Sequence, residues 1–110
     1  MVWHEAAARQ DVRPGCILEV ELRGHALALY DLNGVVYATR AVCPHQSAWF
    51  SQGMIEGDRV HCPRHQGCFH IPTGRQISGP SCPPLRVYPT RNEAGTILVG
   101  DLEQPAVRRE

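Results

Sequence analysis

Alternating apolar and polar residues predict short strands along most of the chain. The first alternating run covers residues 17–22 (Ile-Leu-Glu-Val-Glu-Leu), and the second covers residues 26–32 after Gly24. Residues 35–42 follow the dipeptide Asn33-Gly34, which is the strongest short hairpin signal that a sequence can carry. We therefore expect these segments to pair as an antiparallel meander.

The second half of the chain continues this pattern of short strands between turns. The predicted strands are residues 60–62, 69–71, 85–88 and 96–99. Many short strands with intervening turns indicate an all-β sandwich or barrel. Helix is expected to be minor, because only residues 5–10 and 48–52 could form helical turns and neither stretch is long enough to be stable alone.

Length and composition indicate one folded domain. A chain of 110 residues has apolar surface for a single core, so we expect one domain over residues 1–110. Apolar residues make up 43% of the chain and charged residues 20%, which is the balance of a globular protein. A single small domain in turn favours a single functional site.

Charge and targeting signals exclude several classes of partner. Lys and Arg balance Asp and Glu at 11 each, so the chain lacks the basic field that gathers nucleic acid or anionic lipid. The first residues do not resemble a secretory signal, and no apolar run approaches the roughly 20 residues that cross a bilayer. We expect a soluble, cytoplasmic protein with no nucleic-acid or membrane partner. In that reducing compartment, an odd count of cysteines favours metal binding over disulfides.

The candidate chemistry lies in two related cysteine–histidine motifs. Cys43-Pro44-His45 and Cys62-Pro63-Arg64-His65 each lie on a loop that leaves a predicted strand. Each motif supplies one thiolate and one imidazole, so four soft or borderline metal ligands can converge. A structural zinc site uses the same ligand types. Zinc fingers, however, usually place their two cysteines first and their two histidines afterwards, whereas each motif here holds one of each.

The paired motifs resemble the Rieske signature C-x-H…C-x-x-H. In that family two cysteines hold one iron of a [2Fe–2S] cluster and two histidines hold the other iron. The resemblance implies one such cluster as the cofactor, with Cys43 and Cys62 as thiolate ligands and His45 and His65 as imidazole ligands.

The resemblance also carries an expectation about the fold. It extends from about Val12 to Leu102 and includes the turn Thr73-Gly74 and the segment 84–89. It implies a Rieske-type β-sandwich or barrel in which two ligand loops form a small cluster-binding subdomain, at about residues 42–82.

Within that family, this sequence resembles the low-potential members. With neutral imidazoles, two ferric ions, two sulfides and two thiolates carry no net charge, which places Rieske centres at about −150 to +300 mV against about −400 mV for plant-type ferredoxins. High-potential members add a disulfide between the ligand loops, and serine and tyrosine hydroxyls that bond to cluster sulfur. The matching positions here are Ala48 and Arg64 for the disulfide, and Gly67 and Phe69 for the hydroxyls. Without these groups, the potential is expected near the low end of the family.

A Rieske-type ferredoxin is the function that this resemblance implies. Such proteins typically carry electrons from an NAD(P)H-dependent flavoprotein reductase to a terminal aromatic-ring-hydroxylating Rieske oxygenase. The chain has no room for the non-haem iron domain of an oxygenase, so we expect a monomeric carrier and not an enzyme. Two alternatives stay open: a small Rieske subunit of another oxidoreductase, such as an assimilatory nitrite reductase, and a zinc-stabilised binding module without redox chemistry.

The other residues near these motifs are expected to be structural. Cys16, Cys68 and Cys82 are predicted to be small buried apolar side chains and not disulfide partners. His70 is predicted to be a surface or hydrogen-bonded strand residue, in preference to a pH-sensitive neighbour of the cluster.

Large apolar residues follow the first ligand loop. Trp49, Phe50 and Met54 are predicted to pack in the core over the cluster, with an apolar docking rim as the alternative. In the loops themselves, the backbone N–H groups of Gln46 and Gly67 are expected to reach cluster sulfur.

Overall fold

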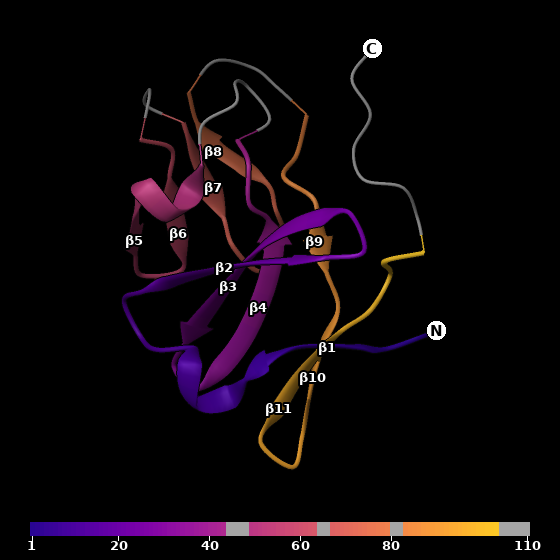
Figure 1. Ribbon diagram of the computed structural model, residues 1–110. Helices are drawn as coiled ribbons and strands as arrows, with labels where there is room; N and C mark the ends of the chain where they lie inside the picture. Colours follow the sequence, from indigo (N-terminus) through magenta and orange to yellow (C-terminus); the bar gives the residue numbers. More distant parts are fainter. Residues whose placement is uncertain (44–48, 64–66, 80–82, 104–110) are drawn as a thin grey trace.

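A computed structural model describes residues 1–43, 49–63, 67–79 and 83–103 (Figure 1). Three antiparallel sheets run in the orders β1-β11-β10, β2-β3-β4-β9 and β5-β6-β7-β8. The strands are β1 (His4–Ala8), β2 (Ile17–Leu22), β3 (His25–Leu32), β4 (Val35–Arg40), β5 (Met54–Glu56), β6 (Arg59–His61), β7 (Cys68–His70), β8 (Gln76–Ser78), β9 (Val87–Tyr88), β10 (Thr90–Glu93) and β11 (Thr96–Val99). The predicted all-β fold is confirmed, and no helix in the described segments is long and apolar enough to span a membrane.

Strand β3 lies between two hydrophobic cores. Its Leu27 and Leu29 face one core, whereas Ala28 and Tyr30 face the other, because successive side chains of a strand point to opposite faces. The predicted meander is confirmed, since β3 pairs along its length with β2 and β4. The Asn33-Gly34 turn has φ values of 56° and 88°, as a two-residue hairpin turn of the primed type requires.

The N-terminal segment is a strand, and the helical turn predicted for residues 5–10 is wrong for most of its length. β1 pairs with β11, and its Ala6 and Ala7 pack against the core that contains Leu27 and Leu29. Pairing with a strand distant in sequence, together with burial, outweighs the helix propensity of successive alanines. Only the 3₁₀ helix η1 (Arg9–Asp11) forms a helical turn here.

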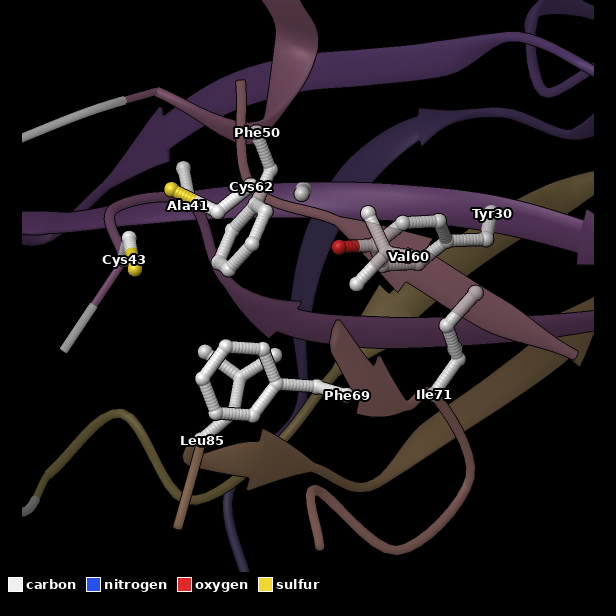
Figure 2. Packing of buried hydrophobic residues seen from close by; sticks show 10 residues of the cluster. Tyr30, Ala41, Cys43, Phe50, Val60, Cys62, Phe69, Ile71 and Leu85 are labelled. Carbon is white, nitrogen blue, oxygen red and sulfur yellow. The ribbon is translucent and has the colours of Figure 1, made fainter. Parts of the chain in front are cut away.

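The β5-β6-β7-β8 sheet contributes to the core on the other face of β3. Phe69 of β7 and Phe50, the first residue of the 3₁₀ helix η2 (Phe50–Gln52), form an edge-to-face pair with ring centroids 5.9 Å apart (Figure 2). The helical turn predicted near residues 48–52 is confirmed at η2. The sequence pattern does not predict β5, β8 or β10, because they are short and carry mostly exposed side chains, so no apolar alternation marks them.

An ion pair ties η1 to the β3–β4 hairpin. Arg9 donates hydrogen bonds of 2.8 Å to the Asp31 carboxylate and 2.9 Å to the carbonyl oxygen of Val12. The backbone N–H of Gly34 donates a further bond of 2.9 Å to Asp31. The Arg9 hydrogen bond, followed by the Gly34 N–H, lowers the pKa of the Asp31 carboxyl below its ordinary value.

The turn after β7 approaches the segment before β9 very closely. Gly74 donates a backbone hydrogen bond of 2.7 Å to His70 and accepts one of 2.8 Å from Leu85. Its φ is +77°, and a Cβ at this position would lie 1.9 Å from the carbonyl oxygen of Leu85. Only glycine fits this turn without movement of the backbone.

Gly74→Ala is expected to lower the free energy of unfolding by at least about 2 kcal/mol, because the added methyl collides with a backbone carbonyl. The control is Gly95→Ala, where φ is +86° and nothing lies within 4 Å of the added Cβ. That variant should lose only about 1 kcal/mol, from backbone strain alone. Urea unfolding followed by circular dichroism measures both values, and equal losses would show that the close contact is unimportant.

Asp31→Asn is expected to destabilise the protein at neutral pH and to become harmless in acid. The folded-state pKa of Asp31 is lowered, so its contribution is fully present above the unfolded-state pKa of about 3.9 and is lost as the pH falls through the folded-state value. The melting temperatures of the variant and the parent should therefore converge below about pH 4. The control is Asp11→Asn, because Asp11 is exposed and lies outside the ion pairs of the described segments. Its melting temperature should equal that of the parent at neutral pH, so there is no difference to disappear in acid. A deficit for Asp31→Asn that persisted unchanged into acid would rule out the ionised carboxylate as its source.

Candidate metal centre

The two predicted thiolate ligands converge inside one core. Cys43 follows β4 and Cys62 directly follows β6, and their side chains are 2% and 5% exposed. Both belong to the hydrophobic cluster that contains Phe50 and Phe69, and Figure 2 shows them at the same end of that cluster. Two thiols that are distant in sequence are therefore brought to one place.

Backbone hydrogen bonds fix the base of the first ligand loop. The N–H of Phe50 donates a bond of 2.9 Å to the carbonyl of Ala41, and Ala41 in turn donates one of 2.8 Å to Ala26 of β3. Val42 and Trp49 pair as an isolated antiparallel bridge across the two ends of the loop. Cys43 is consequently held at the start of a closed loop whose other end is also anchored.

The second ligand loop is closed in the same way. His61 and Cys68 are opposite each other in the β6–β7 pair, and the N–H of Cys62 donates a bond of 2.8 Å to the carbonyl of Gly67. This use of the Gly67 carbonyl is not foreseen from the sequence, which suggested a role for its N–H group. The two predicted strands on either side of the motif are spaced as in a hairpin, and this spacing could have predicted a backbone hydrogen bond between the two ends of the loop.

Several predicted site residues lie outside the described residues. Both imidazole ligands, His45 and His65, fall there, and their assignment stays a prediction. The same holds for the loop residues Gln46, Ala48, Arg64 and Cys82.

The described donor set fits the thiolate half of an iron–sulfur site. Two buried cysteines on two loops match the ligands of one iron, and the predicted histidine of each motif is two or three residues further along the chain. Within the described residues alone, no group of three or more His, Cys, Asp and Glu side chains is arranged to hold a metal ion. A complete centre here would draw its other ligands from segments 44–48 and 64–66.

The large apolar residues after the first loop divide between core and surface. Phe50 is fully buried as predicted, but Trp49 and Met54 are 39% and 60% exposed, so the core prediction is wrong for both. Trp49 precedes η2, and Met54 begins the outer strand β5, where its side chain points away from the core.

The remaining cysteines behave differently from one another. Cys68 is buried as predicted, and burial raises the pKa of its thiol, which disfavours the reactive thiolate. Its Sγ lies 3.9 Å from Nε2 of His61, which also bonds to Glu56 at 2.9 Å. Cys16 is exposed, so its predicted burial is wrong, because it lies in the turn that leads into β2.

His70 is a hydrogen-bonded strand residue, as predicted. Its Nε2 lies 2.9 Å from the Asp58 carboxylate and its Nδ1 lies 2.8 Å from the hydroxyl of Thr73. These bonds join the β5–β6 turn to the turn after β7, so His70 stabilises the frame around the ligand loops.

Comparisons with known proteins identify the family of this chain. The sequence model of the Rieske [2Fe–2S] domain family matches residues 2–89. The ferredoxin component of the naphthalene 1,2-dioxygenase system of Pseudomonas putida is 38% identical over 97 residues, which covers 88% of this chain and 93% of that protein.

Solved structures give the same result. The ferredoxin of Sphingomonas yanoikuyae B1 superposes with a TM-score of 0.86 at 30% identity, covering 94% of this chain and all of that one. The ferredoxin–oxygenase complex of carbazole 1,9a-dioxygenase contains a chain with a TM-score of 0.82 at 35% identity, covering 89% of this chain and 92% of that one. A protein described as a nitrite reductase small subunit from Mycobacterium tuberculosis superposes with a TM-score of 0.78 at 31% identity, covering 89% of this chain and 93% of that one. This chain therefore belongs to the Rieske [2Fe–2S] domain family, alongside the ferredoxin components of dioxygenase systems.

Proposed function

We propose that this protein is a one-electron carrier that holds one Rieske-type [2Fe–2S] cluster through Cys43, His45, Cys62 and His65. The observation that carries the proposal is the convergence of Cys43 and Cys62 in one buried cluster, each at the start of a loop that contains a predicted histidine ligand. When bound, the cluster supplies reversible one-electron chemistry near the low end of the Rieske range.

The described residues support such a site by excluding water and fixing the ligands. Phe50, Phe69 and Leu85 form an apolar wall beside the two thiols, and each is at most 2% exposed. Phe69 carries no hydroxyl and Gly67 carries no side chain, so neither supplies the donors to sulfur that raise the potential of high-potential relatives. This supports the low-potential assignment.

The proposed partners are those of the ferredoxins in aromatic dioxygenase systems. A flavoprotein ferredoxin reductase would supply the electron and a terminal Rieske oxygenase would accept it. The relatives are named as ferredoxin components, and one is solved in complex with its oxygenase, which supports the second partner. The protein would act as a monomer in the cytoplasm and would not itself be an enzyme.

The similarity to the mycobacterial protein favours one alternative, a small Rieske subunit of a nitrite reductase. Such a subunit would remain bound to a large catalytic chain, whereas a mobile carrier would purify alone. Purification from the native host under gentle conditions, followed by gel filtration, separates the two functions.

Spectroscopy of the purified protein tests the cofactor directly. The protein is expected to be brown, to contain about two iron and two sulfide per chain, and to give an electron paramagnetic resonance signal only after dithionite reduction. Removing the iron with a chelator should abolish the colour and lower the melting temperature, because the metal joins the two loops. A colourless protein with stoichiometric zinc would support the zinc-stabilised binding module instead.

His45→Cys and His65→Cys are each expected to lower the reduction potential or to lose the cluster, because a third thiolate adds negative charge to the site. Potentiometric titration of the loaded protein measures this change. His70→Gln is the matched control, since His70 bonds to Asp58 and Thr73 and is not a proposed ligand. An unchanged potential in either ligand variant would refute its assignment.

A further inference from the structure

A small groove lies beside the base of the first ligand loop. It has a volume of about 240 Å³ and is lined by Glu19, Val20, Glu21, Ala26 and Trp49. We call these residues the acidic groove. Glu19 and Glu21 belong to the edge strand β2 and are exposed, and the described residues give β2 a single strand partner, β3.

The position of Trp49 connects the acidic groove to the proposed cluster site. Trp49 pairs with Val42, which immediately precedes Cys43. Its side chain is 39% exposed, so a large aromatic surface remains in contact with water beside the ligand loop. Tryptophan with one face packed and one face exposed is enriched at protein interfaces, where burial of the ring gives much of the binding energy.

No basic side chain among the described residues pairs with the carboxylates of the groove. In the described segments, three acidic residues pair with arginines (Asp31, Glu93 and Asp101) and three hydrogen-bond to histidines (Glu56, Asp58 and Glu103). Glu19 and Glu21 are in none of these pairs, and no basic residue lines the groove. Ser51 of η2 donates a hydrogen bond of 2.9 Å to Glu19, which orients its carboxylate without neutralising it.

We propose that the acidic groove is a docking surface for a redox partner that presents a lysine or arginine next to an apolar side chain. The cation would lie between the two carboxylates and the apolar group would cover the indole of Trp49. Opposite charges steer the encounter, and a contact of this size suits the small, short-lived interfaces of electron-transfer proteins. This proposal rests on the proposed function as an electron carrier.

Ferric cytochrome c tests the proposal, because it is a basic one-electron acceptor. The cluster-loaded full chain is reduced, freed of excess dithionite and mixed with cytochrome c in a stopped-flow instrument. One electron leaves each ferredoxin and reduces one haem. The variant Glu19→Gln/Glu21→Gln should lower the second-order rate constant by at least about three-fold at low ionic strength, and this difference should vanish at high salt.

The matched control is Glu5→Gln/Asp11→Asn, which removes the same charge. Both residues are exposed and lie outside the ion pairs of the described segments, on β1 and on η1, away from the ligand loops (Figure 1). Its rate constant should stay close to that of the parent. Equal slowing in the two double variants would mean that only net charge matters, and no slowing in the groove variant would mean that basic partners dock elsewhere. Either result overturns the proposal.

Trp49→Ala and Trp49→Phe separate the apolar contact from the charge. The alanine variant should slow the reaction at both low and high salt, and phenylalanine should restore most of the rate. The visible spectrum and potential of every variant are measured first, so that equal driving force is established. A parent protein that holds no cluster, or that cannot reduce cytochrome c, would contradict the proposed function. Equal rates among variants that all reduce cytochrome c would contradict the docking surface alone.

Discussion

The burial of β3 on both faces is the constraint on which the rest of the structure depends. One face meets the core that also receives β1 and β11, and the other face meets the core that contains the two cysteines. A register slip of one residue would exchange these faces. The polar group that Tyr30 buries on the second face has a hydrogen-bond partner. Burial raises the pKa of the Tyr30 hydroxyl, which shares a hydrogen bond of 2.8 Å with Thr39. The hydroxyl is thus neutral and paired, as a buried polar group must be.

The position of the first ligand follows from that same strand. A backbone bond joins Ala41 to Ala26, next to Leu27 of β3, and a second bond joins Phe50 to Ala41. The start and the end of the loop that begins at Cys43 are therefore set by the register of the central sheet. The second loop depends instead on the β6–β7 pair, through the bond between Cys62 and Gly67. The pairing of β5 with β6 and the shared apolar cluster bring the two loops together, and the packing of Phe50 against Phe69 is part of that cluster.

Sequence reasoning succeeded where the signal is local. The Asn33-Gly34 turn and the three strands around it follow from dihedral preference and alternation, and the family that the cysteine–histidine spacing indicated is confirmed. It failed where contacts between residues distant in sequence decide the secondary structure or the burial of a residue. Residues 4–8 are rich in alanine, yet they pair with a strand near the other end of the chain. Burial of Cys16 and Trp49 could not be judged either, because it depends on which neighbour covers each residue and not on the residue type.

The distribution of charge explains how a chain with no net charge can still select a partner. A protein with equal numbers of acidic and basic residues exerts little long-range electrostatic attraction. The orientation of a partner must then come from local groups of like charge that have no opposite charge beside them. Arginines pair with acidic residues on β3, on β10 and near the C-terminal end of the described chain, and histidines hydrogen-bond to those on the β5–β6 hairpin and to Glu103. The carboxylates of Glu19 and Glu21 have no such partner among the described residues, and unlike those of Glu5 and Asp11 they lie beside the ligand loop. An attraction limited to one such place fades within about a Debye length, roughly 8 Å at physiological salt. It would orient a nearby partner without holding it, which is the requirement for a carrier that must bind and release many times.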